Sequence, residues 1–192
     1  MPVNLQHEAE NNLRYIRQAM ERAERVSAVS GVGGMAMGFC AFLATAVASM
    51  FATLPAQLAV WIGTAFISLL CGAAATWLKA RQLHTPLFGD ASKRFLTCLV
   101  PALMVGAILS WLLWPTPQNI LLPAMWMLLY GCGVLAAGTY AAAPVMQMGF
   151  CFLGAGLIMT ALPAGWENFG LGLVFGGLHL YFGWQVFRNH GG

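Results

Sequence analysis

One histidine in the middle of a long apolar segment is the residue best placed to do chemistry inside a membrane. His179 stands within Phe175–Tyr181, near the centre of a predicted span over about 168–187. An imidazole at that depth needs a hydrogen-bond partner or a polar cavity, and ionisable groups within spans are functional candidates by default. Ligand binding, proton transfer and metal ligation are the functional possibilities, whereas the structural alternative is an interhelical hydrogen bond. Together with Tyr130 and Tyr181, His179 forms the candidate ligand or pathway site.

A four-residue repeat supplies the second candidate site, and its ligands are sulfur atoms. Met37-Gly-Phe-Cys40 recurs as Met148-Gly-Phe-Cys151 in a segment predicted to cross the membrane in the same direction. Met and Cys at i and i+3 share one helix face, and thioether with thiolate is a soft ligand set that suits Cu(I). The alternative is ordinary packing, because Met commonly fills gaps in apolar interiors. Cu(I) is the one metal to which these residues point, and no other cofactor is predicted.

Conventional catalytic patterns are missing from the sequence. It contains no G-x-S-x-G, H-E-x-x-H, P-loop or C-x-x-C pattern, and its four histidines lack metal-ligand spacing. Asp, Glu, Lys and Arg are also missing from the centre of every predicted span, whereas pumps and symporters generally use a carboxylate there. We therefore expect a protein that is not an enzyme, does not couple transport to ions and does not bind nucleic acid.

The composition identifies the elements that must position these residues. Only 15 of 192 residues are acidic or basic and 59% are apolar, whereas a soluble domain carries about 25% charged residues. Six apolar runs are each long enough to cross about 30 Å of hydrocarbon, and they are continuous rather than alternating, which predicts helices. The predicted fold is all-α, a polytopic membrane protein in which residues 28–192 form a six-helix bundle. The spans are expected at about 29–51, 55–78, 95–114, 120–139, 144–163 and 168–187.

The distribution of Lys and Arg predicts the orientation of the bundle. All nine basic residues precede the first span, lie between the second and third spans, or follow the sixth. With six spans, these three segments face the same side of the membrane. Because cytoplasmic loops carry an excess of Lys and Arg, both termini are predicted to be cytoplasmic.

Residues 1–27 are predicted to form a cytoplasmic amphipathic helix. Leu13, Ile16 and Met20 recur at spacings of three and four, which gives one narrow apolar stripe. Residues 8–25 contain four acids and four arginines, whereas a helix anchored to anionic lipid is expected to be strongly basic. This balance favours binding to a partner or self-association, and the alternative is a helix lying on the cytoplasmic face of its own bundle.

Two pairs of glycines predict close helix packing. Gly34 and Gly38 in the first span, and Gly172 and Gly176 in the sixth, are small residues four apart that let helices approach closely. Such faces serve either packing within one chain or an oligomer interface, and the sequence leaves both open.

Several segments carry a resemblance to a known family. They are Asn12–Glu21, Leu128–Val134, Pro144–Met146 with Gly149–Cys151, Phe175–His179 and the terminal Gly191-Gly192. In these segments the chain resembles a family of bacterial six-helix membrane proteins with no known activity. The resemblance implies a location in the bacterial inner membrane and implies no reaction.

Three functions are compatible with these features. The first is a non-enzymatic membrane module, an oligomeric scaffold or sensor that works through helix packing and its N-terminal helix. Its partners would be membrane lipids and either further copies of the chain or another membrane protein. The second is a channel or facilitator for a small or apolar solute, with His179 lining the route. The third is an accessory subunit that binds a lipid, a quinone or a soft metal.

Overall fold

The computed structural model describes residues 7–16, 29–83 and 89–190, and all of its regular elements within these ranges are helices. After the N-terminal helix, the elements are α2 (Gly31–Ala48), α3 (Leu54–Gln82), α4 (Asp90–Leu113), the 3-10 helix η1 (Pro117–Leu121), α5 (Leu122–Gly138), α6 (Ala143–Met159), α7 (Glu167–Leu171), the π-helical segment η2 (Gly172–Gly176) and α8 (Gly177–His190).

The predicted all-helical membrane fold is confirmed at this coarse level. Four helical segments are long and apolar enough to cross a membrane, namely α2, α3, α4 and η1 with α5. Helix α6 is apolar but has only 17 residues. The sixth predicted span is divided into α7, η2 and α8, and its π-helical turn falls in the glycine-rich segment Gly172–Gly176.

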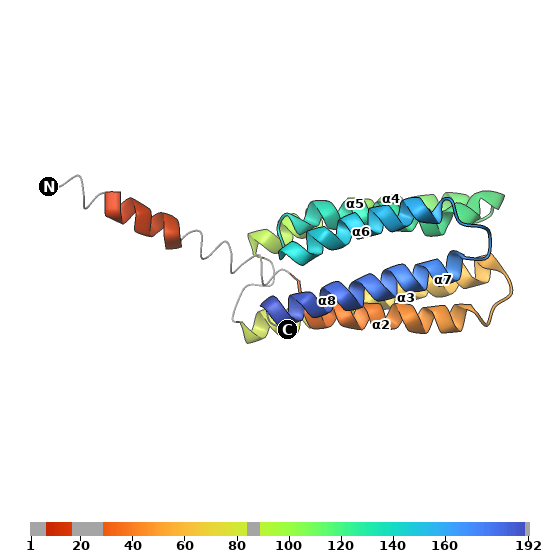
Figure 1. Cartoon of the computed structure of the whole chain (residues 1–192), viewed down its shortest axis with the longest axis horizontal. Coiled ribbons are helices and arrows are strands. Elements are labelled where there is room, and N and C mark those ends of the chain that lie inside the picture. Colours follow the sequence, from red (N-terminus) through yellow and green to blue (C-terminus); the bar gives the residue numbers. More distant parts are fainter. Residues whose placement is uncertain (1–6, 17–28, 84–88, 191–192) are drawn as a thin grey trace.

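The helices form two layers (Figure 1). One layer contains α4, α5 and α6, and the other contains α2, α3 and α7 to α8. Within the layers, α5 packs on α4 and α6, and α2 packs on α3 and α8. Contacts between α6 and α8 help to join the layers. The layer of α4, α5 and α6 is formed by consecutive helices. The other layer combines α2 and α3, which precede these helices in the sequence, with α7 to α8, which follow them.

Prolines lie in the first turn of three α-helices. Pro55, Pro123 and Pro144 lie in the first turn of α3, α5 and α6, where the missing N–H would have no helical partner. Helix α2 begins differently, since the Ser30 hydroxyl accepts a hydrogen bond of 3.3 Å from the Gly33 amide. Pro101 lies inside α4.

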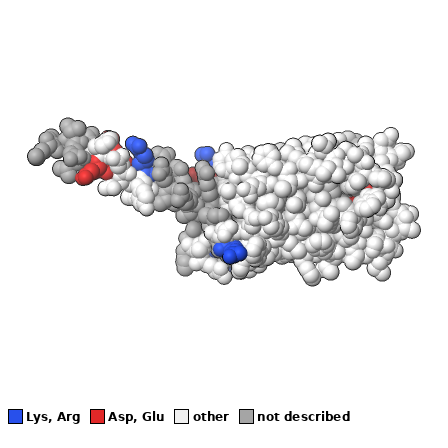
Figure 2. All heavy atoms as spheres, viewed as in Figure 1, with Lys and Arg blue, Asp and Glu red and all other residues white. Residues whose placement is uncertain are grey.

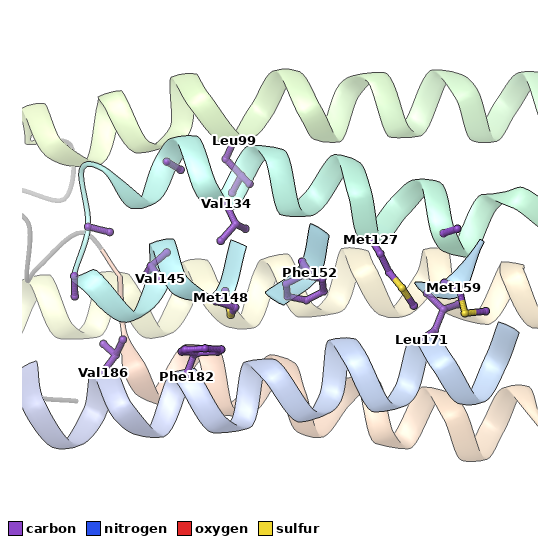
Figure 3. Packing of buried hydrophobic residues seen from close by; sticks show 14 residues of the cluster. Leu99, Met127, Val134, Val145, Met148, Phe152, Met159, Leu171, Phe182 and Val186 are labelled. Atoms are coloured by element: carbon purple, nitrogen blue, oxygen red, sulfur yellow. The ribbon is translucent and has the colours of Figure 1, made fainter. Parts of the chain in front are cut away.

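The hydrophobic core fills the seam between the two layers (Figure 3). Met127, Val134 and Phe152 on one side of the seam, and Leu171 and Phe182 on the other, are buried. The outward faces of α3 and α4 are apolar as well but exposed. Examples are Phe66 and Leu70 on α3, and Met104 and Trp111 on α4. Apolar faces of this extent on a monomer fit a surrounding of lipid rather than water.

The glycine faces pack α2 against the last helical segment of the same chain. A Cβ added at Gly38 would lie 2.8 Å from the Gly176 carbonyl oxygen, and one at Gly34 would lie 3.1 Å from the Gly183 Cα. Gly172 faces Thr45 of α2. All four glycines of the two predicted pairs therefore serve packing within the chain, which is one of the two alternatives that the sequence left open.

The N-terminal helix stands apart from the bundle. Residues 7–16 are helical and every one of them is exposed, with Leu13 at 67% and Ile16 at 53%. Figure 1 shows this helix beyond the end of the bundle. Over these residues the helix therefore does not lie on its own bundle. Met20, the third residue of the predicted stripe, lies outside the described residues.

The basic residues gather at one end of the bundle. In the view of Figure 2, Lys and Arg lie at the N-terminal helix and at the adjoining end of the bundle, here called the basic end. There the guanidinium groups of Arg81 and Arg188 lie 4.5 and 5.4 Å from the ring centres of Trp77 and Trp184. The opposite end, here called the far end, holds the α2–α3 connection, η1 and the α6–α7 connection.

Candidate functional site

His179 and Tyr130 form a hydrogen-bonded pair inside the bundle. The Tyr130 hydroxyl of α5 lies 2.8 Å from Nε2 of His179 on α8, and Nδ1 of His179 lies 2.8 Å from the Phe175 carbonyl oxygen. His179 is only 5% exposed. Because a carbonyl oxygen can only accept, Nδ1 carries the proton, and Nε2 of the neutral ring accepts from the tyrosine hydroxyl. Both ring nitrogens are thus satisfied by the chain itself.

Aromatic rings surround this pair. Tyr130 and Phe152 are in edge contact with ring centres 4.8 Å apart, and Phe152 meets Phe175 at the same distance. The imidazole of His179 stacks on the Phe175 ring at 6.1 Å. These four residues come from α5, α6, η2 and α8, so the cluster connects the two layers. His179 therefore makes the interhelical hydrogen bond that the sequence analysis gave as the alternative to a functional role, and it does so among apolar rings.

Tyr181, the third member of the predicted pathway site, does not join this cluster. Its side chain is 55% exposed and packs edge-on against Phe182 at 4.9 Å. Of the three predicted residues, the structure brings together His179 and Tyr130.

The sulfur residues of the predicted copper site are divided between the two layers. Met37 and Cys40 face α3, where Met37 approaches Gly72 and Cys40 lies near the side chains of Cys71 and Ser68. Met148 is buried in the core cluster on α6, while Cys151 is exposed on the same helix. Met37 and Cys40 share a face as predicted, but that face meets α3 rather than α6.

Clustered metal ligands of the usual kinds are missing from the described part of the chain. Within it, no group of three or more His, Cys, Asp or Glu side chains could hold a metal ion. All five cysteines are free thiols. The sequence analysis did not predict that Cys40 lies near Cys71. The available signal was the pair of small residues Cys71 and Gly72 on α3, since α2 packs closely against Gly72.

A cleft opens at the far end, between the two layers. A cavity of about 480 Å³ is lined by residues of the α2–α3 connection, η1 and the start of α7. A second cavity of about 180 Å³ lies beside it, toward α5 and α6. Both are lined by Ile120, Ala164 and Glu167. We call these two cavities together the far-end cleft.

Glu167 is the buried charged residue of this cleft. It is 8% exposed, and its Oε2 accepts a hydrogen bond of 2.7 Å from the amide of Gly165. Gly165 has a φ of +100°, a conformation that glycine adopts without strain. The turn before α7 thus holds the carboxylate in place. Sequence reasoning placed Glu167 at a membrane interface and missed the cleft, although no other acidic residue lies in the predicted outer loops.

Asn168 connects three helices beneath the same cleft. Its Oδ1 accepts from the Trp61 indole nitrogen of α3 at 2.9 Å, and its Nδ2 donates to the Thr45 carbonyl oxygen of α2 at 3.1 Å. Both ends of the amide are therefore engaged, and Asn168 is a rigid part of the cleft wall rather than a free binding group.

The core separates the far-end cleft from the His179–Tyr130 pair. Met127, Met159 and Leu171 are 0%, 9% and 5% exposed and fill the seam near the far end (Figure 3). Met159 lies against Gly170, which leaves room for its thioether. The cleft and the histidine thus belong to one seam but are separated by flexible, apolar side chains.

Three features of this arrangement could serve function: the exposed N-terminal helix, the His179–Tyr130 pair inside the bundle and the far-end cleft around Glu167. None of them includes a nucleophile activated by a base, or a pair of carboxylates at a distance suited to acid–base catalysis. Comparison of the chain with known protein families, curated proteins and solved structures found no match.

Proposed function

We propose that this protein is a non-enzymatic membrane module of six spans, an oligomeric scaffold or sensor whose N-terminal helix binds a second copy of the chain. The proposed location is the bacterial inner membrane, with both termini in the cytoplasm. The observation that carries the proposal is the uncovered apolar stripe of the helix over residues 7–16, in which Leu13 and Ile16 are exposed.

The charge of this helix supports pairing with another helix rather than binding to lipid headgroups. The helical residues 7–16 carry Glu8, Glu10 and Arg14, so they do not form the basic surface that anionic lipid attracts. Two such helices can bury their stripes against each other. A stripe of this length is short for an independent coiled coil, so the membrane bundles must hold the copies close together to raise their effective concentration.

A pair of matched variants tests this proposal. Leu13→Gln with Ile16→Gln removes the apolar stripe and keeps good helix formers, whereas His7→Gln with Asn11→Gln changes the opposite face. Native mass spectrometry of the full chain in a non-ionic detergent reports the number of subunits. We expect oligomers for the wild type and the control, and monomers for the stripe variant. A wild type that is monomeric, or a stripe variant that keeps its oligomers, would overturn the proposal.

A facilitator for a small solute is the second candidate function. The far-end cleft and the His179–Tyr130 pair lie along the same seam between two layers, and this favours it. Passage would require Met127 and Met159 to move aside, which long unbranched side chains permit. Solute flux into proteoliposomes that is lost in His179→Leu but kept in Tyr181→Phe would support this function, and equal flux in both variants would refute a route past His179.

A further inference from the structure

We propose that the far-end cleft binds a small organic cation, a solute that carries one ammonium group, with Glu167 as its counter-charge. This site is separate from the N-terminal helix, and binding to it does not depend on association of the chain.

The size of the cleft suits a small molecule. The larger cavity measures about 480 Å³, which lies within the range of about 300–1,000 Å³ typical of ligand sites. The adjoining cavity adds about 180 Å³. Glu167 lines both. A solute that fills the larger cavity therefore meets this group wherever it extends toward the smaller one.

Glu167 lacks a cationic partner within the described chain. Its hydrogen bond from the Gly165 amide engages Oε2, and no ion pair to its carboxylate is found among the described residues. Neither cavity is lined by Lys or Arg. A buried carboxylate is costly unless a charge or several donors compensate it, so the cleft is electrostatically matched to a bound cation and opposed to an anion.

The remaining polar groups of the cleft offer acceptors. The Gln57 amide nitrogen donates to the Phe51 carbonyl oxygen at 2.8 Å, and the Ser49 hydroxyl donates to the Ala46 carbonyl oxygen at 2.7 Å. Both residues line the larger cavity. Ser49 has used its single donor and Gln57 one of its two, and the side-chain oxygens of both remain as acceptors. An ammonium group has three donors and no acceptor, which complements a carboxylate, an amide oxygen and a hydroxyl oxygen.

The nature of the lining favours an organic cation over a metal ion. Ca²⁺ takes six to eight oxygen ligands, and Mg²⁺ requires near-octahedral geometry, whereas the cleft supplies one carboxylate and the neutral side-chain oxygens of Gln57 and Ser49. Phe169 also lines the larger cavity and is 55% exposed. An aromatic face attracts an ammonium group or packs on the hydrocarbon part of the solute.

The test measures binding of benzylammonium to the full chain in a non-ionic detergent by isothermal titration calorimetry. Benzyl alcohol and benzoate are the probes matched in shape. We expect the wild type to bind benzylammonium at least tenfold more tightly than either control probe. Equal affinity for benzylammonium and benzyl alcohol, or the absence of binding, would overturn the proposal without the need for any variant.

Two variants then assign the charge. Glu167→Gln removes the negative charge but keeps an oxygen that accepts from the Gly165 amide, so the turn is preserved. Asp90→Asn removes one acidic charge at the basic end and is the matched control. We expect at least a tenfold loss of benzylammonium affinity in Glu167→Gln, as for the loss of a charge-assisted hydrogen bond, and no change in Asp90→Asn. Equal losses in both variants, or none in Glu167→Gln, would refute the role of Glu167.

Discussion

Replacing the tyrosine of the buried pair should destabilise the bundle by a predictable amount. Tyr130→Phe removes the hydroxyl that lies 2.8 Å from Nε2 of His179 and leaves the ring contacts with Phe152 and Phe175 in place. The imidazole then keeps its bond to the Phe175 carbonyl oxygen but loses the partner of its second nitrogen. Because the aromatic cluster supplies no other hydrogen-bonding side chain, the change isolates one hydrogen bond.

The expected cost follows from the burial of His179. A buried acceptor left without a partner costs about 1–3 kcal/mol, while interhelical hydrogen bonds in membrane proteins average about 0.6 kcal/mol in double-mutant cycles. His179 is 5% exposed and lies among rings, so water or lipid headgroups cannot replace the hydroxyl. We therefore expect Tyr130→Phe to lower the free energy of unfolding by about 1–2 kcal/mol.

A double-mutant cycle distinguishes the hydrogen bond from ordinary packing. His179→Leu alone leaves the Tyr130 hydroxyl buried without its partner, whereas the double variant leaves neither group. The double variant should lose at least about 1 kcal/mol less than the sum of the single losses. Unfolding is followed by circular dichroism as the full chain is titrated with SDS in mixed micelles, and Tyr181→Phe is the exposed control. Additive losses, or an equal loss in Tyr181→Phe, would refute the reasoning.

Two further predictions test the packing of α2. Gly38→Ala places a methyl group 2.8 Å from a carbonyl oxygen of η2 and should cost about 1–3 kcal/mol in the same titration. Gly63→Ala, where nothing lies within 4 Å, should cost nothing or add stability. Mild oxidation with copper phenanthroline should link Cys40 to Cys71, its neighbour on α3, as read by peptide mass spectrometry. A link between Cys40 and Cys151 instead would contradict the assignment of α2 and α6 to different layers.

Local properties of the sequence determined the class of the protein and much of its helical layout. The scarcity of charge and the continuous apolar runs predict membrane helices because every backbone group must be paired inside lipid. Pro55, Pro123 and Pro144 begin helices because a proline in the first turn loses no hydrogen bond. These signals depend on a few neighbouring residues or on a window of about 20, so they can be read without knowing how helices meet.

Boundaries were less accurate where helices are interrupted. The sixth predicted span, about 168–187, is divided by the π-helical turn at Gly172–Gly176. Composition alone does not place such a turn. The turn lies where Thr45 and Phe42 of α2 pack against Gly172 and Gly176.

The tertiary structure alone decided which helix faces meet, and this determines every candidate site. The sequence singled out His179, but only the arrangement of α5 and α8 provides Tyr130 as its partner. The repeat in the sequence paired Met37 and Cys40 with residues of α6, whereas packing directs them to α3. The far-end cleft around Glu167 arises where three connections distant in the sequence come together. In a chain this uniformly apolar, helix pairing follows the shapes of facing surfaces, which only the assembled layers reveal.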